Sequence, residues 1–291
     1  MEAQRPMQFI ETQPAFADLL GRLSQERSFA LDTESNSFHA YFERVCLVQL
    51  SSRAADFVVD PFAVDVRPMG ELLADPAVEV VLHASDYDIR CLKRDFGFEF
   101  RAIFDTMLAA KMLGRSAIGL AALVHEHFGV QMAKEHQRSD WGRRPLTPEQ
   151  IAYAHADTRF LLPLRDRLAE DLARAGKLAE ARAAFDRQAA CVPARRRFDA
   201  EGYRKVRGYR ALDERERAVA QALYLLREDC ARASNRPPFK VYGDEALVEL
   251  SRQKPCSLGE LSEVRGIGRS TVRRNGEEIV AAIAAAAQRT A

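Results

Sequence analysis

Short strand-like runs alternate with helix-like stretches over the first 110 residues, and this alternation limits the chain to few folds. Apolar runs bounded by polar segments predict β-strands, here at residues 28–32, 45–50, 56–59, 78–82 and 103–104. Helices are expected at about residues 69–74, 87–96, 106–113 and 118–128. For Tyr87–Phe96, apolar residues recur at helical spacing up to Gly97. Strands that alternate with helices argue for an α/β domain built on a mixed sheet.

A capping box marks the start of a long helical region. Thr147-Pro148-Glu149-Gln150 places Thr before the helix, Pro at its first position and Gln at its third. Pro163 is expected to kink or break the helix, because proline lacks the N–H that an interior position uses. Helical composition continues to about residue 190. The first domain is therefore predicted to span residues 1–190.

The remaining third of the chain divides into two segments. Residues 191–212 combine proline, two glycines and many arginines, and we predict a basic linker there. Residues 213–291 are helical in composition, with breaks at Pro237-Pro238, Pro255 and Gly266. We therefore expect a small all-α bundle after the linker.

The charge of the chain is divided unevenly between its two parts. The net charge is +1, but residues 191–291 hold 20 Lys+Arg against 14 Asp+Glu. This excess suggests binding of a polyanion at one end and cation chemistry at the other, although a solvated basic surface is an equal alternative.

Composition excludes several other classes of protein. The longest apolar runs fall short of the roughly 18 residues of a membrane span, and the N-terminus lacks the apolar core of a signal peptide. We therefore expect a cytoplasmic protein without a membrane partner. The five cysteines form no CxxC pair, so reduced thiols are expected instead of disulfides or zinc.

Four acidic residues occupy positions from which they can meet. Asp32 and Glu34 end an apolar strand and, being two residues apart, share one face. Asp157 lies one helical turn after Tyr153 on a common helix face, and Asp88 begins the helix after strand 78–82. Two divalent cations held by carboxylates activate water and stabilise charge in phosphodiester cleavage. Each position is weak alone, but together they predict a site for Mg²⁺ or Mn²⁺.

The segments that contain these residues resemble a known family. FALDTES, LHASDYDI and YAHADTRFLLPL resemble the three motifs of DEDDy 3′-to-5′ exonucleases, and RSDWGRRPLTPEQ is similar to ribonuclease D in particular. The stretch from residue 213 to about 285, with VRGIGRSTVRRNGEEI, resembles the HRDC domain. These resemblances imply an RNase H-like mixed-sheet exonuclease domain followed by one HRDC helical bundle. Ribonuclease D of bacteria is expected to carry two such bundles, which leaves the substrate open.

The resemblance also implies a role for each residue of the motifs. Asp32, Glu34 and Asp157 would hold the metal ion that activates water. Asp32 would also contact a second ion near the leaving 3′ oxygen, assisted by Asp88. Tyr153 would position the attacking water, because a phenol pKa near ~10 makes it a poor base. The implied activity removes single nucleotides, as 5′-monophosphates, from the 3′ ends of tRNA precursors and other small structured RNAs.

Five further side chains are candidates for contact with nucleic acid. Tyr41 follows the first motif, where it could meet a terminal nucleotide, and His83 either approaches the substrate or packs as a hydrogen-bonded histidine. Arg265, Arg269 and Arg273 surround a Gly-Ile-Gly turn that suits either phosphate binding or a solvated basic face.

One acidic and one aromatic side chain near the motifs are expected to have structural roles. Asp105 is expected to cap the helix that follows it. Trp141, the single tryptophan, is expected to anchor packing more than to stack on a base.

Two other functions compete with an exoribonuclease. The same chemistry on DNA, as in repair exonucleases, is the nearer one, because the HRDC domain also occurs in helicases. A non-catalytic nucleic-acid-binding protein on a nuclease scaffold is the other, although the complete carboxylate set argues against it. The sequence does not define the oligomeric state, and we expect a monomer.

Overall fold

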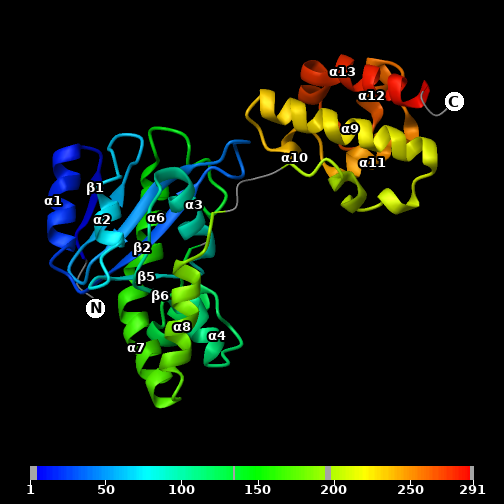
Figure 1. Ribbon diagram of the computed structural model, residues 1–291. Helices are drawn as coiled ribbons and strands as arrows, with labels where there is room; N and C mark the ends of the chain where they lie inside the picture. Colours follow the sequence, from blue (N-terminus) through cyan, green and yellow to red (C-terminus); the bar gives the residue numbers. More distant parts are fainter. Residues whose placement is uncertain (1–4, 134, 194–197, 289–291) are drawn as a thin grey trace. The chain divides into compact units, whose positions relative to one another are not determined.

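The computed structural model describes residues 5–133, 135–193 and 198–288, which form two compact units. The first unit comprises Met1–Asn36 and Arg44–Arg195. The second unit comprises Ser37–Glu43 and Arg196–Ala291. Figure 1 shows the first unit as a sheet flanked by helices and the second as a group of helices.

Within the described residues, six strands of the first unit form one mixed sheet in the order β1-β4-β3-β2-β5-β6. Their bounds are β1 Met7–Ile10, β2 Ser28–Ser35, β3 Val45–Ser51, β4 Asp56–Val59, β5 Glu79–Leu82 and β6 Ile103–Asp105. The long strand β2 pairs antiparallel with β3 and parallel with β5. The predicted mixed α/β sheet is therefore confirmed, and β2 occupies an interior position in it.

Most described helices of the first unit follow the predicted boundaries closely, but α1 was not predicted. They are α1 Gln13–Leu23, α2 Met69–Leu73, α3 Asp86–Phe96, α4 Thr106–Met112, α5 Leu120–Phe128, α6 Pro148–Arg159, α7 Leu161–Arg174 and α8 Leu178–Ala189. The capping box at the start of α6 is formed, with Thr147 and Gln150 each bonding the other's backbone. The predicted break comes at Phe160, three residues before Pro163.

Strand β2 lies between buried strands and beneath helices in the core of this unit. Every residue of β3 and β4 is buried, so these strands are packed on both faces. Helix α7 packs on β2 and β5, while α6 packs on β2, β3 and β4. The end of β2 that carries the first motif thus lies beneath α6.

The second unit has an apolar core of its own. Its helices are α9 Glu214–Ala233, α10 Pro238–Val241, α11 Asp244–Gln253, α12 Leu258–Glu263 and α13 Arg269–Gln288. Asp213 and Glu216 form a second capping box at the start of α9. Helices α11 and α13 pack along α9, where Leu223, Leu247 and Ile279 are fully buried.

The segment predicted as a basic linker, residues 191–212, contains two short helices in its second half. Residues 202–205 and 209–211 form two short 3₁₀ helices. Val206 and Leu212 are buried in the core of the second unit, and Tyr203 is buried against the rings of Tyr209 and Tyr224. Residues 194–197 lie outside the described residues. Arginine and glycine made the segment resemble a linker, but three apolar side chains were enough to fold it onto the helices.

Residues 37–43 also belong to the second unit, although they connect β2 to β3. The Tyr41 hydroxyl donates to the Glu228 carboxylate, and the Phe42 N–H donates to Asn235 Oδ1 at 2.9 Å. His39 Nδ1 lies 3.0 Å from Lys240 Nζ. The predicted first domain, residues 1–190, therefore includes one segment that folds elsewhere.

Across the described ranges, none of the helices has the length and apolar character needed to cross a membrane.

Candidate active site

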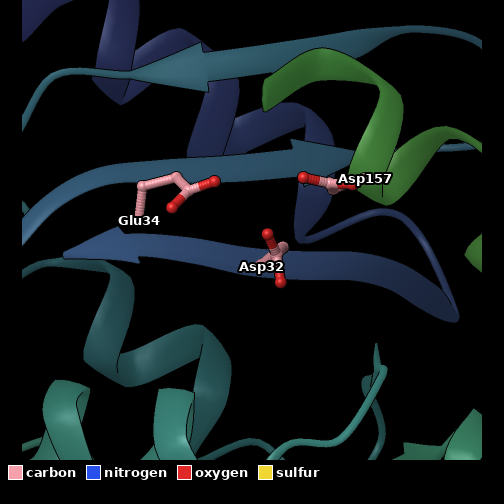
Figure 2. Close-up of side chains that lie close together, drawn as sticks. All are labelled: Asp32, Glu34 and Asp157. Atoms are coloured by element: carbon pink, nitrogen blue, oxygen red, sulfur yellow. The ribbon is translucent and has the colours of Figure 1, made fainter. Parts of the chain in front are cut away.

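Strand β2 and helix α6 bring three carboxylates together. Asp32 and Glu34 lie two residues apart on β2, and Asp157 lies in the last turn of α6. One carboxylate oxygen from each of the three lies within 4.8 Å of the others. Figure 2 shows Asp157 extending from the helix toward the two residues of the strand. Octahedral Mg²⁺ ligands at ~2.1 Å lie up to about 4.2 Å apart, so a small closure around one ion suffices.

A buried polar network holds α6 over the sheet. His155, two residues before Asp157, contacts the buried Asp56 of β4 with an Nε2–Oδ2 distance of 2.9 Å. Ser51 Oγ donates to Thr158 Oγ1 at 2.7 Å, which links β3 to the same helix. Arg5 lies 3.3 Å from Asp56 Oδ1 and donates to the Arg159 carbonyl at 3.2 Å. These contacts set where Asp157 stands relative to β2.

Asp88, the fourth predicted carboxylate, is outside the group of three and makes a different contact. It occupies the first turn of α3, is 7% exposed, and its Oδ1 accepts a hydrogen bond from Thr33 Oγ1. Thr33 stands between Asp32 and Glu34 on β2, so strand alternation directs it to the opposite side. The charge of Asp88 nevertheless raises the pKa of Asp32, which places the two carboxylates within electrostatic reach.

Burial raises the pKa of all four carboxyl groups, and repulsion by neighbouring carboxylates of the site adds to the rise for Asp32, Glu34 and Asp157. Burial raises the pKa of Glu34 from 4.5 to about 9, and the charges of Asp157 and Asp88 add to the rise. Burial also raises the pKa of Asp32 well above 3.8, as do Asp88, Asp157 and Glu34. The pKa values of Asp88 and Asp157 rise to about 7, mainly because of burial. A divalent cation among these groups would relieve the repulsion and favour the ionised forms.

Tyr153 lies one turn before Asp157 on α6 and faces the same group of carboxylates. Its ring is 8% exposed and packs against His136 and Trp141, with centroid distances of 5.9 and 6.0 Å. Burial, followed by the charge of Asp157, raises the pKa of Tyr153 well above its usual value of 10. The phenol is therefore neutral and can serve as a hydrogen-bond donor. Trp141 is 1% exposed, so the prediction that it anchors packing is confirmed.

Two residues at the C-terminal ends of strands β5 and β6 have structural roles. Asp105 caps α4 by accepting hydrogen bonds from the N–H groups of Met107 and Leu108, as predicted. His83 Nδ1 lies 2.9 Å from Thr106 Oγ1, and burial lowers the pKa of the imidazole. Of the two interpretations of His83, its hydrogen bond and partial burial favour a packed histidine.

The other candidate contacts lie in the second unit. Tyr41 is 7% exposed and packs in that unit's core, so its burial favours packing over the expected contact with a nucleotide. Arg265 precedes α13, and Arg269 and Arg273 lie in the first turns of this helix. All three arginines are exposed.

Sequence reasoning missed the residues that hold the site in place. Thr33 lies inside the first motif, and its alternation relative to Asp32 and Glu34 was the available signal. His155 and Asp56 are 99 residues apart, and nothing local in the sequence pairs them.

A mixed sheet whose interior strand carries two carboxylates, with a third supplied by a covering helix, defines a carboxylate-dependent nuclease of the RNase H-like class. Residues 7–173 match the family model described as a 3′-5′ exonuclease. Residues 216–283 match the HRDC domain. Both matches fall in the order that the motifs predicted.

Individual relatives agree with these matches. Ribonuclease D of Gluconacetobacter diazotrophicus is 34% identical over 281 residues, which cover 95% of this chain and 71% of the relative. The catalytic core of RRP6 from Trypanosoma brucei has a TM-score of 0.90 at 26% identity, covering 98% of this chain and 81% of that one. Escherichia coli RNase D has a TM-score of 0.73 at 30% identity, covering 96% and 75%. The chain belongs to the ribonuclease D family and is a 3′-5′ exoribonuclease.

Proposed function

We propose that this exoribonuclease trims the 3′ ends of tRNA precursors and other small structured RNAs, releasing single nucleotides as 5′-monophosphates. The observation that carries the proposal is the convergence of Asp32, Glu34 and Asp157, whose oxygens lie within 4.8 Å. The Escherichia coli relative is described as an exoribonuclease involved in structured RNA processing, which supports the substrate class.

The donor set at this site fits two divalent cations, Mg²⁺ or Mn²⁺. Asp32, Glu34 and Asp157 would hold one ion, and Asp32 together with Asp88 would hold the other. Hard carboxylate oxygens suit both metals, and the acidic cluster lacks the Cys and His ligands that zinc prefers. When bound, such ions neutralise charge on the phosphate and lower the pKa of water.

The side chains around the carboxylates have their own proposed roles. Tyr153 donates a hydrogen bond that orients the attacking water or a phosphate oxygen, because its raised pKa keeps the proton on the phenol. Thr33 fixes the rotamer of Asp88 by its hydrogen bond. His155 positions α6, and with it Asp157, through its contact with Asp56.

The second unit is proposed to bind RNA near the cleaved end. Binding at a tethered module raises the effective concentration of substrate at the first unit. The partner is RNA with a free 3′ end, and a monomeric protein in the cytoplasm remains the expectation.

The decisive experiment follows a tRNA precursor with a 3′ extension and a label at its 5′ end. With Mg²⁺ or Mn²⁺, we expect a ladder of products shortened one nucleotide at a time, and mononucleotides identified as 5′-monophosphates by chromatography. EDTA or Asp32→Ala should stop shortening, whereas Asp166→Ala, an exposed carboxylate in α7, should not. Equal activity in Asp32→Ala, or faster loss of a matched DNA strand, would refute the proposal.

A further inference from the structure

A pocket of about 720 Å³ lies over α11 in the second unit, and one stripe of this helix forms its floor. Glu245, Val248, Glu249 and Arg252 follow the spacing i, i+3, i+4, i+7, which places them on a single helix face. Val248 is 5% exposed, so the centre of the floor is apolar and the charged groups flank it. The volume lies in the range of about 300–1,000 Å³ typical of sites for small ligands.

Two glycine bends form the sides of the pocket. Gly208 and Gly266 have φ values of +96° and +88°, and each directly follows an arginine. A Cβ on Gly208 would lie 3.5 Å from the side chain of Val248, and one on Gly266 would lie 3.1 Å from Ala246 Cβ. Both bends therefore lie against α11, in a backbone conformation that glycine adopts without strain.

Each of these bends presents an arginine side chain to the solvent. In the part of the chain that the structure describes, the exposed side chains of Arg207 and Arg265 take part in no ion pair or hydrogen bond. Arg252, by contrast, lies 3.2 Å from Glu249, and Arg227 is paired with Asp244 at 2.8 Å. Guanidinium groups without acid partners that line a pocket are donors available to phosphate.

We propose that the pocket formed by these residues, the α11 pocket, binds a single-stranded segment of RNA. Arg207 and Arg265 contact successive phosphates, while Glu245 and Glu249 accept hydrogen bonds from ribose 2′-hydroxyl groups. The proposal rests on the proposed function for its substrate class and adds the place where RNA is held. Arg207 lies outside the HRDC match at residues 216–283, so the pocket is not confined to that domain.

The two glutamates give the pocket its preference for RNA. A carboxylate beside a phosphate-binding arginine weakens the binding of any polyanion unless a donor group compensates for its repulsion. The ribose 2′-hydroxyl is such a donor, and DNA lacks it. The pocket should therefore bind RNA more tightly than DNA of the same sequence.

Fluorescence anisotropy on the whole chain tests this assignment, with EDTA present to prevent cleavage. The probes are a labelled, unstructured 20-nucleotide RNA and the DNA strand of the same sequence. Arg207→Ala/Arg265→Ala should weaken RNA binding about tenfold at moderate salt. It should also reduce the slope of log K against log salt by about 1.4, since each phosphate contact on a single strand contributes about 0.7.

A second variant and a matched control separate specific binding from bulk charge. Glu245→Ala/Glu249→Ala should reduce the RNA-over-DNA preference roughly three- to tenfold, the scale of one or two hydrogen bonds. Arg210→Ala/Arg215→Ala removes the same two charges from exposed positions outside the pocket and should leave binding nearly unchanged. Equal losses in both arginine pairs, or an RNA preference that the glutamate variant does not alter, would overturn the proposal.

Trimming of a four-nucleotide RNA distinguishes this proposal from the proposed function. If the wild-type chain fails to shorten any RNA, the proposed function fails. If it shortens RNA and the pocket variants bind the long probe normally, only the α11 pocket is refuted.

Discussion

His155 Nε2 lies 2.9 Å from Asp56 Oδ2, and this contact joins the helix that carries Asp157 to the first residue of β4. The Asp56 side chain is fully buried. Burial opposes its ionisation, but the hydrogen bond from His155 and the charge of Arg5 lower its pKa overall. Asp56 is thus a buried anion whose partners come from α6 and from the N-terminal segment.

Removing this anion should cost the first unit a large part of its stability. Asp56→Ala leaves His155 without its acceptor and Arg5 without its buried counter-charge, and breaking a buried pair from one side typically costs about 3–5 kcal/mol. Urea unfolding measures the loss. Asp166→Ala is the control, because its ion pair with Arg53 is solvent-exposed and worth at most about 1 kcal/mol. Similar losses in the two variants would show that the buried network does not hold α6.

Asp157→Asn should lower the exonuclease activity and at the same time stabilise the metal-free protein. The amide keeps the size of the side chain but removes a charge that the other carboxylates repel. We therefore expect a higher melting temperature in EDTA and a smaller gain on adding Mg²⁺. Exonuclease activity should fall at least about 100-fold, since even residues that only support metal ligands cost 10–100-fold. Unchanged activity, or a less stable metal-free protein, would contradict the arrangement of the site.

The metal-free protein should lose stability as the pH rises. The pKa values of Asp88 and Asp157 are about 7 and that of Glu34 is about 9, all above their unfolded values near 4. Between about pH 4.5 and pH 9 the folded protein therefore binds more protons than the unfolded chain, and its stability declines with pH.

Thermal unfolding in EDTA at pH 5, 7 and 9 measures this decline. A loss of about 2 kcal/mol lowers the melting temperature by roughly 4–8 °C in a domain of this size. Mg²⁺ binds the ionised carboxylates, so its stabilising effect should grow with pH. A melting temperature that rises with pH in EDTA would show that the carboxyl groups are ionised without metal.

Tyr153→Phe should slow the reaction without changing its pH dependence. The ring would still pack against Trp141 and His136, so the fold is kept. Loss of the hydroxyl removes one positioning hydrogen bond, for which we expect a 10- to 100-fold lower kcat. Because burial holds the pKa of Tyr153 above its usual value, the phenol should not titrate in the working range. If the variant loses an ascending limb of the pH–rate profile, the phenolate of Tyr153 acts as a base instead.

The elements of the sheet were largely predictable because their apolar runs are continuous. Strands β2 to β6 each stand out against polar neighbours, and Thr147-Pro148-Glu149-Gln150 marked the start of α6. Strand β1 (Met7–Ile10) was missed, since only Ile10 of its four residues is buried and its pattern is weak. The segment at 198–212 was predicted as part of a linker because of its arginines and glycines, whereas Tyr203 is buried against Tyr224 of α9, later in the chain.

The site was predictable only as far as its motifs reach. Strand alternation gave the common face of Asp32 and Glu34, and helical spacing gave that of Tyr153 and Asp157. That these two faces meet was predicted only from the resemblance to a family. Local sequence patterns do not show that α6 packs on β2. The roles of the individual residues remain predictions until the variants are assayed.

The chain contributes to the second unit twice, and this limits how the protein can be shortened. Ending the chain near residue 195 would leave the loop 37–43 in place without the side chains that bury Tyr41. The Tyr41 ring would then lie without its packing partners in the loop that follows β2, the strand that carries Asp32 and Glu34. A usable truncation should therefore also excise the loop and join Asn36 to Arg44, whose N–H already donates to Asn36 Oδ1 at 2.9 Å.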